Sequence, residues 1–267
     1  MQEQKYCTCP PDECDTFQFM SKKLGLKVVH PGGLQATKLL AEKCGITNNM
    51  TVLDAGCGCG STSIFLAKQY GCRVVGVDVD PISLIKAQEN ARRQKVLDKV
   101  AFRLGDLNSL PLMDNMFDGA IFQASLIFCD KPTALNSVIH KIQPSGFLGA
   151  VELAWKVPPT PYIMTRVKSV LCSAAMNAEH HPDWVELFQR AGLEVVSSDV
   201  HDLGFSFRDM IANEGLFSAS KIALKCTFDG VARDKISSIT KLFKETDAYL
   251  GYGMYVCRKP LVDRGAS

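Results

Sequence analysis

The sequence predicts an α/β fold in which a parallel sheet is covered by helices on both faces. Two observations carry this prediction: short apolar segments alternate with amphipathic ones, and turn residues separate them along the 267-residue chain. That alternation is typical of βαβ units, which place helices over a parallel sheet. The hydrophobic content of 46% and the charged content of 22% are those of a globular protein, and they argue against a disordered chain.

Helices are expected before the first strand. One is predicted over residues 16–26, and a breaker cluster, HPGG, follows it from His30 onward. Residues 34–44 separate apolar from charged side chains as an amphipathic helix does, and Gly45 provides its C-terminal stop. Residues 1–45 are therefore predicted to form an N-terminal segment and a helical cap.

Strands and helices then alternate. Strands are predicted over residues 50–54, 73–78, 100–104, 119–123 and 147–153. Helices are predicted between them over residues 61–70, 81–94 and 132–142. Asp80 can cap the second of these helices, and Pro81 suits its first helical position.

The C-terminal part continues the pattern with one interruption. A helix is predicted over residues 182–191, and strands are predicted over residues 193–200 and 251–257. Residues 203–249 look mostly helical, and we interpret them as an insertion that covers the substrate. The sequence therefore predicts one domain over residues 46–260 and a short tail at residues 261–267.

Charge and cysteine usage argue against several classes of protein. The 30 Lys and Arg residues against 28 Asp and Glu give a net charge of +2, which is not the footprint of a nucleic-acid-binding protein. No apolar stretch approaches the ~18 residues of a membrane span, and the N-terminus lacks a signal-peptide pattern. The 11 cysteines are typical of free thiols in a reducing cytoplasm. No metal site is predicted, although Cys7, Cys9 and Cys14 leave that question open.

A glycine-rich turn after the first strand is the most informative stretch. Gly56, Gly58 and Gly60 stand directly before a predicted helix, whose first N–H groups have no partner within the helix. Asp78 ends the second strand, and a carboxylate at that point can accept both hydroxyl groups of a ribose. The order of strand, loop, helix, strand and acid therefore predicts a nucleoside-binding site.

The loop does not fit two common nucleotide motifs. A dinucleotide fingerprint, G-x-G-x-x-G, would place its third small residue where Ser61 stands, and Gly60 comes one position early. Asp54 would sit badly beside a pyrophosphate, and it suits a cationic or amino-bearing ligand instead. A P-loop is excluded because no Gly-Lys-Ser/Thr follows.

Five motifs in order give a resemblance to a known family. VLDAGCGCG from Val52 and VVGVDVDP from Val74 resemble the first two motifs of class I S-adenosylmethionine-dependent methyltransferases. RLGDL from Arg103, FDGAIFQASLIF from Phe117 and IQPSGFLGAVEL from Ile142 resemble the next three. The chain is thus identified as a small-molecule member of this family, similar to methyltransferase domains 11 and 25. The resemblance implies a Rossmann-like, seven-stranded mixed sheet whose last strand is antiparallel.

The resemblance also implies a cofactor and its contacts. S-adenosyl-L-methionine would bind, and S-adenosyl-L-homocysteine would be the product. Asp54 would face the ammonium group directly or through water, Asp78 would hold the ribose, and Asp106 would contact the adenine amino group. The residues expected at the cofactor are Asp54, Gly56, Cys57, Gly58, Gly60, Asp78, Val79, Gly105, Asp106, Leu107 and Gln123.

No catalytic residue is assigned from the sequence. Methyl transfer from a sulfonium is an in-line displacement, so positioning can supply most of the catalysis, and a base is needed only where the acceptor proton has a high pKa. Weak candidates are His30, Gln123, Glu152 and Tyr162. Trp155 and Tyr162 could form an apolar or cation-binding wall. A simpler interpretation of Glu152 is a strand-end acid that faces solvent.

The predicted activity is methyl transfer to a small-molecule acceptor. Two features favour it: cap elements precede and interrupt the predicted α/β domain, and the sequence has no stripe of basic residues. A methyltransferase acting on protein or RNA is an alternative, although QASL at residues 123–126 replaces the Asn/Asp-Pro-Pro-aromatic motif of many nucleic-acid enzymes. A non-catalytic protein that binds the cofactor is a second alternative. Arsenite methyltransferases are a third, through Cys44, Cys172 and Cys226, but their Asn-Cys pair after the fourth strand is missing. No nucleic-acid or membrane partner is expected, and the oligomeric state is left open.

Overall fold

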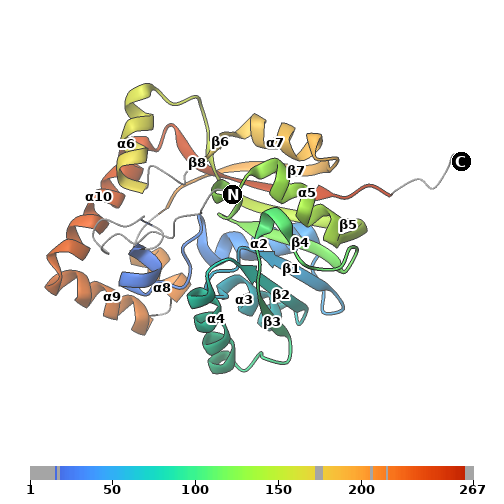
Figure 1. Ribbon diagram of the computed structural model, residues 1–267. Helices are drawn as coiled ribbons and strands as arrows, with labels where there is room; N and C mark the ends of the chain where they lie inside the picture. The colour runs from blue at the N-terminus through green and yellow to red at the C-terminus, as the bar shows by residue number, and fades with distance from the viewer. Residues whose placement is uncertain (1–15, 17–18, 172–176, 205–206, 215, 262–267) are drawn as a thin grey trace, which may run out of the picture.

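A computed structural model describes residue 16 and residues 19–171, 177–204, 207–214 and 216–261 of the chain. Over this part of the chain the strands form one sheet in the order β3-β2-β1-β4-β5-β8-β7, and β6 pairs with the end of β5 (Figure 1). The strands are β1 (Thr51–Ala55), β2 (Arg73–Asp78), β3 (Val100–Leu104), β4 (Phe117–Gln123), β5 (Ile142–Trp155), β6 (Glu179–His180), β7 (Glu194–Asp202) and β8 (Leu250–Arg258).

The sheet is mixed in the predicted way. β1 to β5 are parallel wherever they pair, and β8 is antiparallel to both β5 and β7. The predicted seven-stranded mixed sheet is thereby confirmed, with one addition. The added strand, β6, has two residues and pairs with Ala154 and Trp155. The sequence does not predict it, because two residues are too short to show the alternating pattern of a strand. β5 also begins before its predicted start, because Ile142 pairs with Phe117.

The helices occur in the predicted order, and one further helix, α6, is present. They are α2 (Gly33–Cys44), α3 (Ser61–Gln69), α4 (Pro81–Gln94), α5 (Lys131–Lys141), α6 (Pro161–Leu171), α7 (His181–Arg190), α8 (Phe207–Glu214), α9 (Leu216–Phe228) and α10 (Gly230–Thr246), with the 3-10 turns η2 (Leu107–Ser109) and η3 (Leu126–Phe128). Asp80 accepts the Ile82 N–H at 3.0 Å at the start of α4, and Gly45 ends α2 in the left-handed region, both as predicted. The sequence does not predict α6.

The first predicted helix differs from the expectation. Within the predicted range of residues 16–26, Phe19–Leu24 form the π-helix η1. The Leu26 N–H donates to the Met20 carbonyl, six residues back, which closes a wider turn than that of an α-helix.

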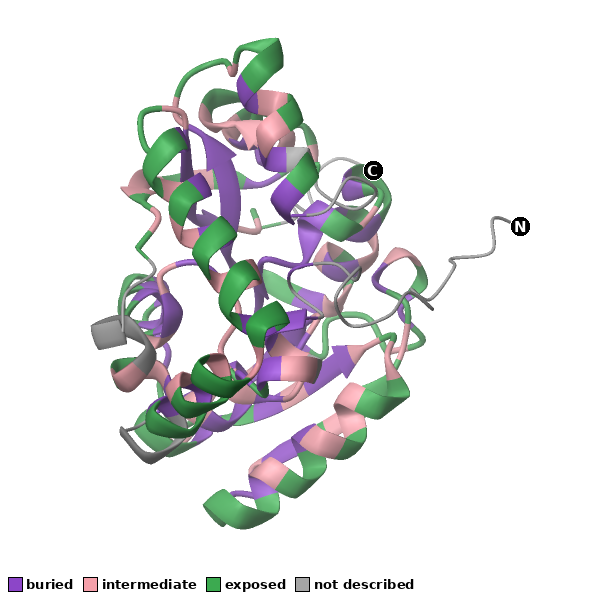
Figure 2. Ribbon diagram, turned by 90° about the vertical axis from the view of Figure 1, so that its left-hand side faces the viewer, coloured by how far each residue is buried: buried purple, intermediate pink, exposed green. Residues whose placement is uncertain are grey.

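Two apolar cores lie on opposite faces of the sheet. Alternate strand residues point to opposite faces, so Val52 and Ile121 belong to one core and Leu53 and Phe122 to the other. Side chains of α2, α3 and α4 complete the first core, and α5, α6, α7 and α10 contribute to the second. Figure 2 shows the buried residues concentrated in the strands and on the inner sides of the helices. The sheet is thus covered on both faces, as predicted.

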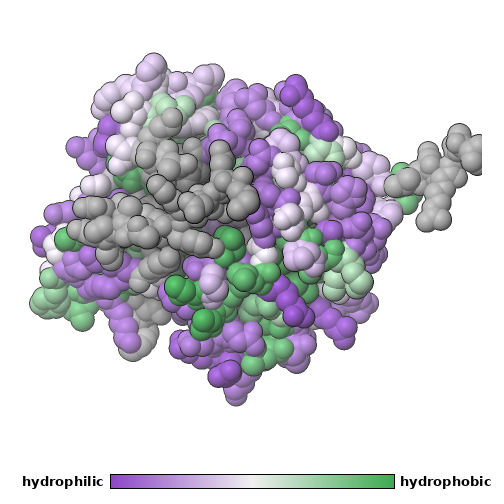
Figure 3. Space-filling view, in the orientation of Figure 1, coloured by the Kyte–Doolittle hydropathy of each residue, from purple (hydrophilic) through white to green (hydrophobic). Residues whose placement is uncertain are grey.

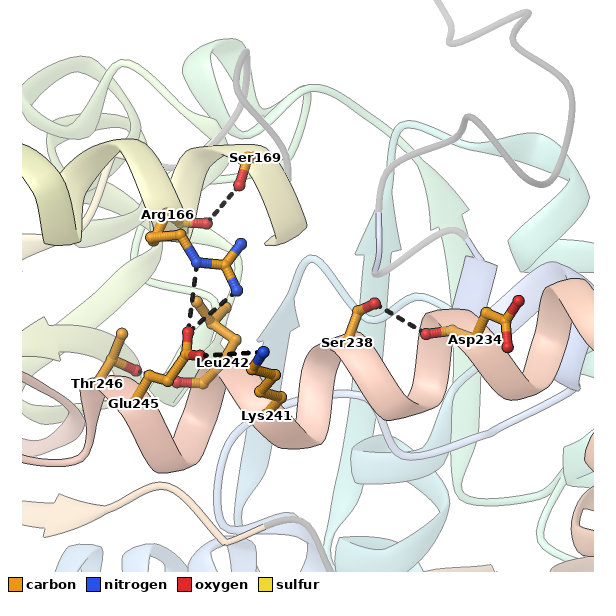
Figure 4. A network of polar contacts seen from close by, with 8 residues as sticks. All are labelled: Arg166, Ser169, Asp234, Ser238, Lys241, Leu242, Glu245 and Thr246. Atoms are coloured by element: carbon orange, nitrogen blue, oxygen red, sulfur yellow. Dashed lines mark hydrogen bonds and ion pairs between the residues drawn. The ribbon is translucent and has the colours of Figure 1, made fainter.

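The predicted helical insertion before the last strand is formed by α8, α9 and α10, which lie with α6 at the left of Figure 1. α10 packs on α6, where Arg166 Nη2 lies 3.0 Å from Glu245 Oε2 (Figure 4). α8 packs on α2, so the insertion meets the N-terminal cap. Among the described residues, no helix is long and apolar enough to cross a membrane.

Candidate functional site

The loop between β1 and α3, residues 56–60, is called the glycine loop below. Gly56, Gly58 and Gly60 all have positive φ, which other residues rarely adopt. A Cβ atom on Gly56 would lie 2.5 Å from Ser125 Cβ, and one on Gly60 would lie 2.8 Å from an aromatic ring. A Cβ atom on Gly58 would meet no atom of the described residues within 4 Å. Internal packing therefore explains two of these glycines, and Gly58 leaves open space where a ligand can approach.

Asp78, the last residue of β2, faces the glycine loop. Its Oδ2 accepts the Gly58 N–H at 2.7 Å, and its Oδ1 accepts the Asp80 N–H at 2.9 Å. Burial raises the pKa of Asp78, while these donors act in the opposite direction. A carboxylate has about four acceptor positions, so both oxygens keep lone pairs for hydroxyl groups of a ligand. The geometry is compatible with ribose binding, which stays a prediction.

Asp54 on β1 has a structural task that the sequence did not indicate. The side chain is 2% exposed, and its Oδ2 accepts the Ser63 hydroxyl at 2.5 Å. Burial raises the pKa of Asp54 to about 6, although hydrogen bonds from the Ser63 hydroxyl and backbone N–H oppose this. The Asp54 carboxylate lies beside the first turn of α3, where a negative charge also complements the helix dipole. Asp54 therefore stabilises the start of α3, and its contact with a cofactor ammonium group stays a prediction.

The region predicted to hold adenine follows β3. The Gly105 N–H donates to the Asp78 carbonyl at 3.0 Å, which ties this turn to β2. Asp106 is exposed, and its Oδ1 accepts the main-chain and side-chain N–H groups of Asn108 at 2.8 and 3.0 Å. Leu107 is buried and Val79 is partly exposed. Figure 3 shows hydrophobic side chains gathered on this face near α4 and β3. Asp106 thus caps η2, and its contact with adenine stays a prediction.

A buried acid holds the segment after β4, residues 124–127, which is called the β4 loop below. Glu152 on β5 is 0% exposed, and its Oε1 accepts the N–H groups of Ser125 and Leu126, each at 3.0 Å. Its Oε2 has no hydrogen-bond partner among the described residues. Burial raises the pKa of Glu152 to about 7, against the effect of the N–H donors. The interpretation of Glu152 as a strand-end acid facing solvent is therefore wrong.

The β4 loop is strained at its first residue. Ala124 has φ 54°, in the left-handed region that disfavours a side chain. Its N–H donates to the Val151 carbonyl at 2.8 Å, and the Ser125 hydroxyl donates to the Ala55 carbonyl at 2.7 Å. These bonds place the β4 loop against the glycine loop. Such strain is frequent at functional sites, but no sequence signal marks it here, since alanine is not typical of this conformation.

Polar side chains connect α3 to the N-terminal cap. Gln123 ends β4; its Oε1 accepts the Thr62 hydroxyl, and its Nε2 donates to Thr37 Oγ1 at 3.0 Å. Thr37 Oγ1 lies 3.4 Å from His30 Nε2. His30 Nδ1 lies 3.2 Å from the Pro31 carbonyl, which can only accept, so we assign the ring hydrogen to Nδ1. Burial lowers the pKa of His30 to about 4, so the ring is neutral. The structure thus brings together His30 and Gln123, which the sequence had singled out separately.

A cavity of about 270 Å³, called the α8 cavity below, lies between the N-terminal cap and the insertion. Its walls come from the segment around His30, from the end of β7 and from α6, α8 and α10. Glu214, at the end of α8, also lines it. No sequence signal identifies Glu214, because a single acid at a helix end belongs to no motif. His30 connects this cavity to the polar side chains of α2 and α3.

Tyr162 and Trp155, which the sequence analysis named, lie apart from this cluster, and so does His181. Tyr162 is 68% exposed on α6, and it is not part of the lining of the α8 cavity. Trp155 is buried in an apolar core. His181 Nδ1 lies 3.0 Å from the Tyr255 hydroxyl, and the two rings stack. Packing therefore accounts for Trp155 and His181.

The cysteines form no metal site in the part of the chain that the structure describes. There, no three His, Cys, Asp or Glu side chains gather to hold a metal ion. Cys44 and Cys226 belong to separate apolar clusters. Cys57 in the glycine loop is buried, and burial raises its pKa. Four cysteines lie outside the described residues: Cys7, Cys9, Cys14 and Cys172.

The chain is similar to known methyltransferases over most of its length. A family model described as a methyltransferase domain matches residues 52–146. The chain is 24% identical over 243 residues to the uncharacterized methyltransferase YodH of Bacillus subtilis, which covers 90% of this chain and 97% of the relative. It is 27% identical over 210 residues to the O-methyltransferase cnsE of Penicillium expansum, which covers 78% of this chain and 71% of the relative.

A solved structure has the same fold. It is phosphoethanolamine N-methyltransferase 2 of Haemonchus contortus in complex with S-adenosyl-L-methionine, with a TM-score of 0.71 and 16% identity, covering 91% of this chain and 56% of that chain. The matched residues 52–146 include the glycine loop, Asp78 and the β4 loop. The prediction from five sequence motifs is thereby confirmed: the chain contains a methyltransferase domain over residues 52–146, has methyltransferase relatives, and has the fold of class I S-adenosylmethionine-dependent methyltransferases.

Proposed function

We propose that the chain transfers the methyl group of S-adenosyl-L-methionine to a small-molecule acceptor that binds in the α8 cavity. One observation carries the proposal: Gly58 presents open space beside the carboxylate of Asp78, at the carboxyl ends of parallel strands. Open α/β sheets bind their ligands at that edge.

The residues at this edge fit the cofactor. The cofactor carries a ribose with two hydroxyl groups, which suit the spare acceptor positions of Asp78. Its carboxylate suits the N–H groups of the glycine loop and of the first residues of α3, where the helix dipole also favours negative charge. Asp106 would contact the adenine amino group, with Val79 and Leu107 as apolar neighbours. Asp54, whose side chain is held by the Ser63 hydroxyl, would attract the ammonium group electrostatically.

When bound, S-adenosyl-L-methionine supplies a methyl group on a sulfonium, a good leaving group for in-line displacement. The residues of the chain position the acceptor relative to this methyl group. The β4 loop is fixed by Glu152 and Ser125, so it can form a rigid wall beside the glycine loop. Gln123 and Thr37 lie between α3 and His30, on the path from the cofactor edge to the α8 cavity. Orientation of this kind can supply most of the rate enhancement.

The size and the lining of the α8 cavity favour a small acceptor over a macromolecule. Its volume of about 270 Å³ is just below the ~300–1,000 Å³ of small-molecule pockets, and mostly apolar residues line it. The naming of cnsE as an O-methyltransferase supports an acceptor of this kind. A neutral His30 could accept a proton through Nε2, although its pKa of about 4 makes it a weak base. The cytoplasmic location stays a prediction.

A transfer assay tests the proposal. The purified chain is incubated with methyl-labelled S-adenosyl-L-methionine and with separate metabolite, protein and RNA fractions. We expect label in the metabolite fraction, and none with the Asp78→Ala variant. Label confined to protein or RNA would contradict a small-molecule acceptor, and no transfer to any fraction would favour a cofactor-binding protein without catalysis.

A further inference from the structure

The α8 cavity joins parts of the chain that are distant in sequence. Met20, Leu26 and Val28 line it from the N-terminal cap, and Leu171 and Phe243 line it from α6 and α10. Asn213 Oδ1 of α8 accepts the Leu34 N–H at 2.8 Å. A Cβ atom on Gly33 would lie 2.3 Å from the Asn213 amide, so α8 sits directly against the start of α2. The cavity therefore has largely apolar walls, and the hydrogen bond from Leu34 to Asn213 fixes α8 against the start of α2.

Glu214 places a carboxylate in this apolar setting. It is 8% exposed, and its Oε1 accepts the N–H groups of Lys27 and Val28 at 2.7 and 2.9 Å. Burial raises the pKa of Glu214, and these two bonds, which fix the side chain, act in the opposite direction. Its Oε2 is buried and has no hydrogen-bond partner among the described residues. A buried polar atom without a partner is costly, so it marks a place where a ligand group is expected.

Among the other polar side chains of the described lining, His30 and Asp202 offer acceptors, whereas the amides of Gln35 and Asn213 offer N–H donors as well. The neutral His30 ring directs Nδ1 to the Pro31 carbonyl and leaves Nε2 as an acceptor. Asp202 already pairs with Lys156, whose Nζ lies 2.6 Å from its Oδ1. No Lys or Arg is among the described residues that line the cavity. The described part of the lining therefore offers the carboxylates of Glu214 and Asp202, and no Lys or Arg side chain for a phosphate or a carboxylate.

We propose that the acceptor of this enzyme is an apolar molecule with a hydrogen-bond-donating group, an amine or a hydroxyl, that binds Glu214 Oε2, and that the cavity rejects anionic acceptors. This inference rests on the proposed function, because it describes the acceptor of the same reaction. Glu214 would anchor the acceptor at one end. The polar residues Thr37, Gln123 and Thr62 extend from His30 toward α3, so the other end would face the cofactor edge.

Four matched probes test the preference: 2-phenylethylamine, 2-phenylethanol, 3-phenylpropanoate and phenyl phosphate. Each is titrated calorimetrically into the wild-type chain, without and with S-adenosylhomocysteine. We expect the amine or the alcohol to bind at least tenfold more tightly than either anion. The tighter of the two shows whether ammonium or hydroxyl is preferred. Anion binding as tight as that of both donor probes, or no binding of either donor probe at millimolar concentration, would overturn the proposal.

Glu214→Gln tests the anchor. An amide oxygen can still accept the Lys27 and Val28 N–H groups, so the variant is expected to fold, and its melting temperature checks this. Loss of a charged partner should weaken amine binding about tenfold to a hundredfold, and alcohol binding less. Glu245→Gln, outside the cavity lining, should change probe binding by less than about twofold. Unchanged binding of both donor probes to Glu214→Gln would overturn the role of Glu214. A different result would overturn the proposed function: absence of S-adenosylhomocysteine binding to the wild-type chain.

Discussion

The hydrogen bonds of the glycine loop join residues near one another in the sequence, whereas the α8 cavity joins segments far apart. Gly58 and Asp78 are 20 residues apart, and Asp54 and Ser63 are 9 apart. In the cavity, Lys27 and Glu214 are separated by 187 residues. A local strand-loop-helix unit brings its own residues together, but the cavity exists only once the insertion has packed on the N-terminal cap. We therefore expect substitutions in the two regions to separate cofactor binding from acceptor binding.

Asp78→Ala is expected to have the largest effect. It removes the acceptors proposed for the ribose and the partner of the Gly58 N–H, so affinity for S-adenosylhomocysteine should fall at least about a hundredfold. Calorimetry measures this loss, and circular dichroism checks the fold. If the variant keeps its affinity for S-adenosylhomocysteine, the assignment of cofactor binding to Asp78 is wrong. Asp78→Asn, which keeps one oxygen, should give an intermediate loss.

Gly56→Ala and Gly58→Ala should differ within the same loop. A Cβ atom on Gly56 would collide with Ser125, so this change should lower the free energy of unfolding by about 2–5 kcal/mol through strain and overpacking. The Gly58 change should cost only about 1–2 kcal/mol, because open space surrounds that position, but it should weaken cofactor binding. Urea denaturation and calorimetry compare the two. Equal losses of stability would contradict the distinction between a packed and a ligand-facing glycine.

Glu152→Gln should change how stability depends on pH. Because burial raises the pKa of Glu152 from 4.5 to about 7, the folded state keeps a proton that the unfolded state loses. The wild-type chain should therefore lose up to about 3 kcal/mol of stability relative to Glu152→Gln as pH rises from about 4.5 to 7. The amide oxygen can still hold the β4 loop. Urea denaturation at pH 5 and pH 8 measures the difference, and a constant difference between the two proteins would exclude a buried, protonated Glu152.

Glu245→Gln should have the smallest effect. Its ion pair with Arg166 joins α10 to α6, but both side chains are about one-third exposed (Figure 4). An exposed pair contributes roughly 0–1 kcal/mol, so the free energy of unfolding should fall by less than about 1 kcal/mol. A loss above 2 kcal/mol would mean that this contact holds the insertion in place.

The same contrast explains how much could be predicted from the sequence. Apolar periodicity and turn residues predicted the strands and most helices, and the order of the glycine loop and Asp78 predicted a nucleoside site, because such contacts are local. The task of Glu152 was missed because an acid within an apolar strand does not show what it faces. The left-handed backbone of Ala124 has no signal in its residue type. It is fixed by the bond from the Ala124 N–H to the Val151 carbonyl and by the bonds from the next two residues to Glu152. Glu214 could not be identified from the sequence, because its hydrogen bonds to Lys27 and Val28 form only when α8 packs on the N-terminal cap.

Titration of S-adenosylhomocysteine and of NAD into the wild-type chain tests the central claim most directly. The open space at Gly58 and the acceptor positions of Asp78 predict binding of S-adenosylhomocysteine in the micromolar range, measured as heat and as a thermal shift. The poor match of the loop to a dinucleotide fingerprint predicts no binding of NAD. No heat and no thermal shift with S-adenosylhomocysteine, or a clear shift with NAD, would contradict the account.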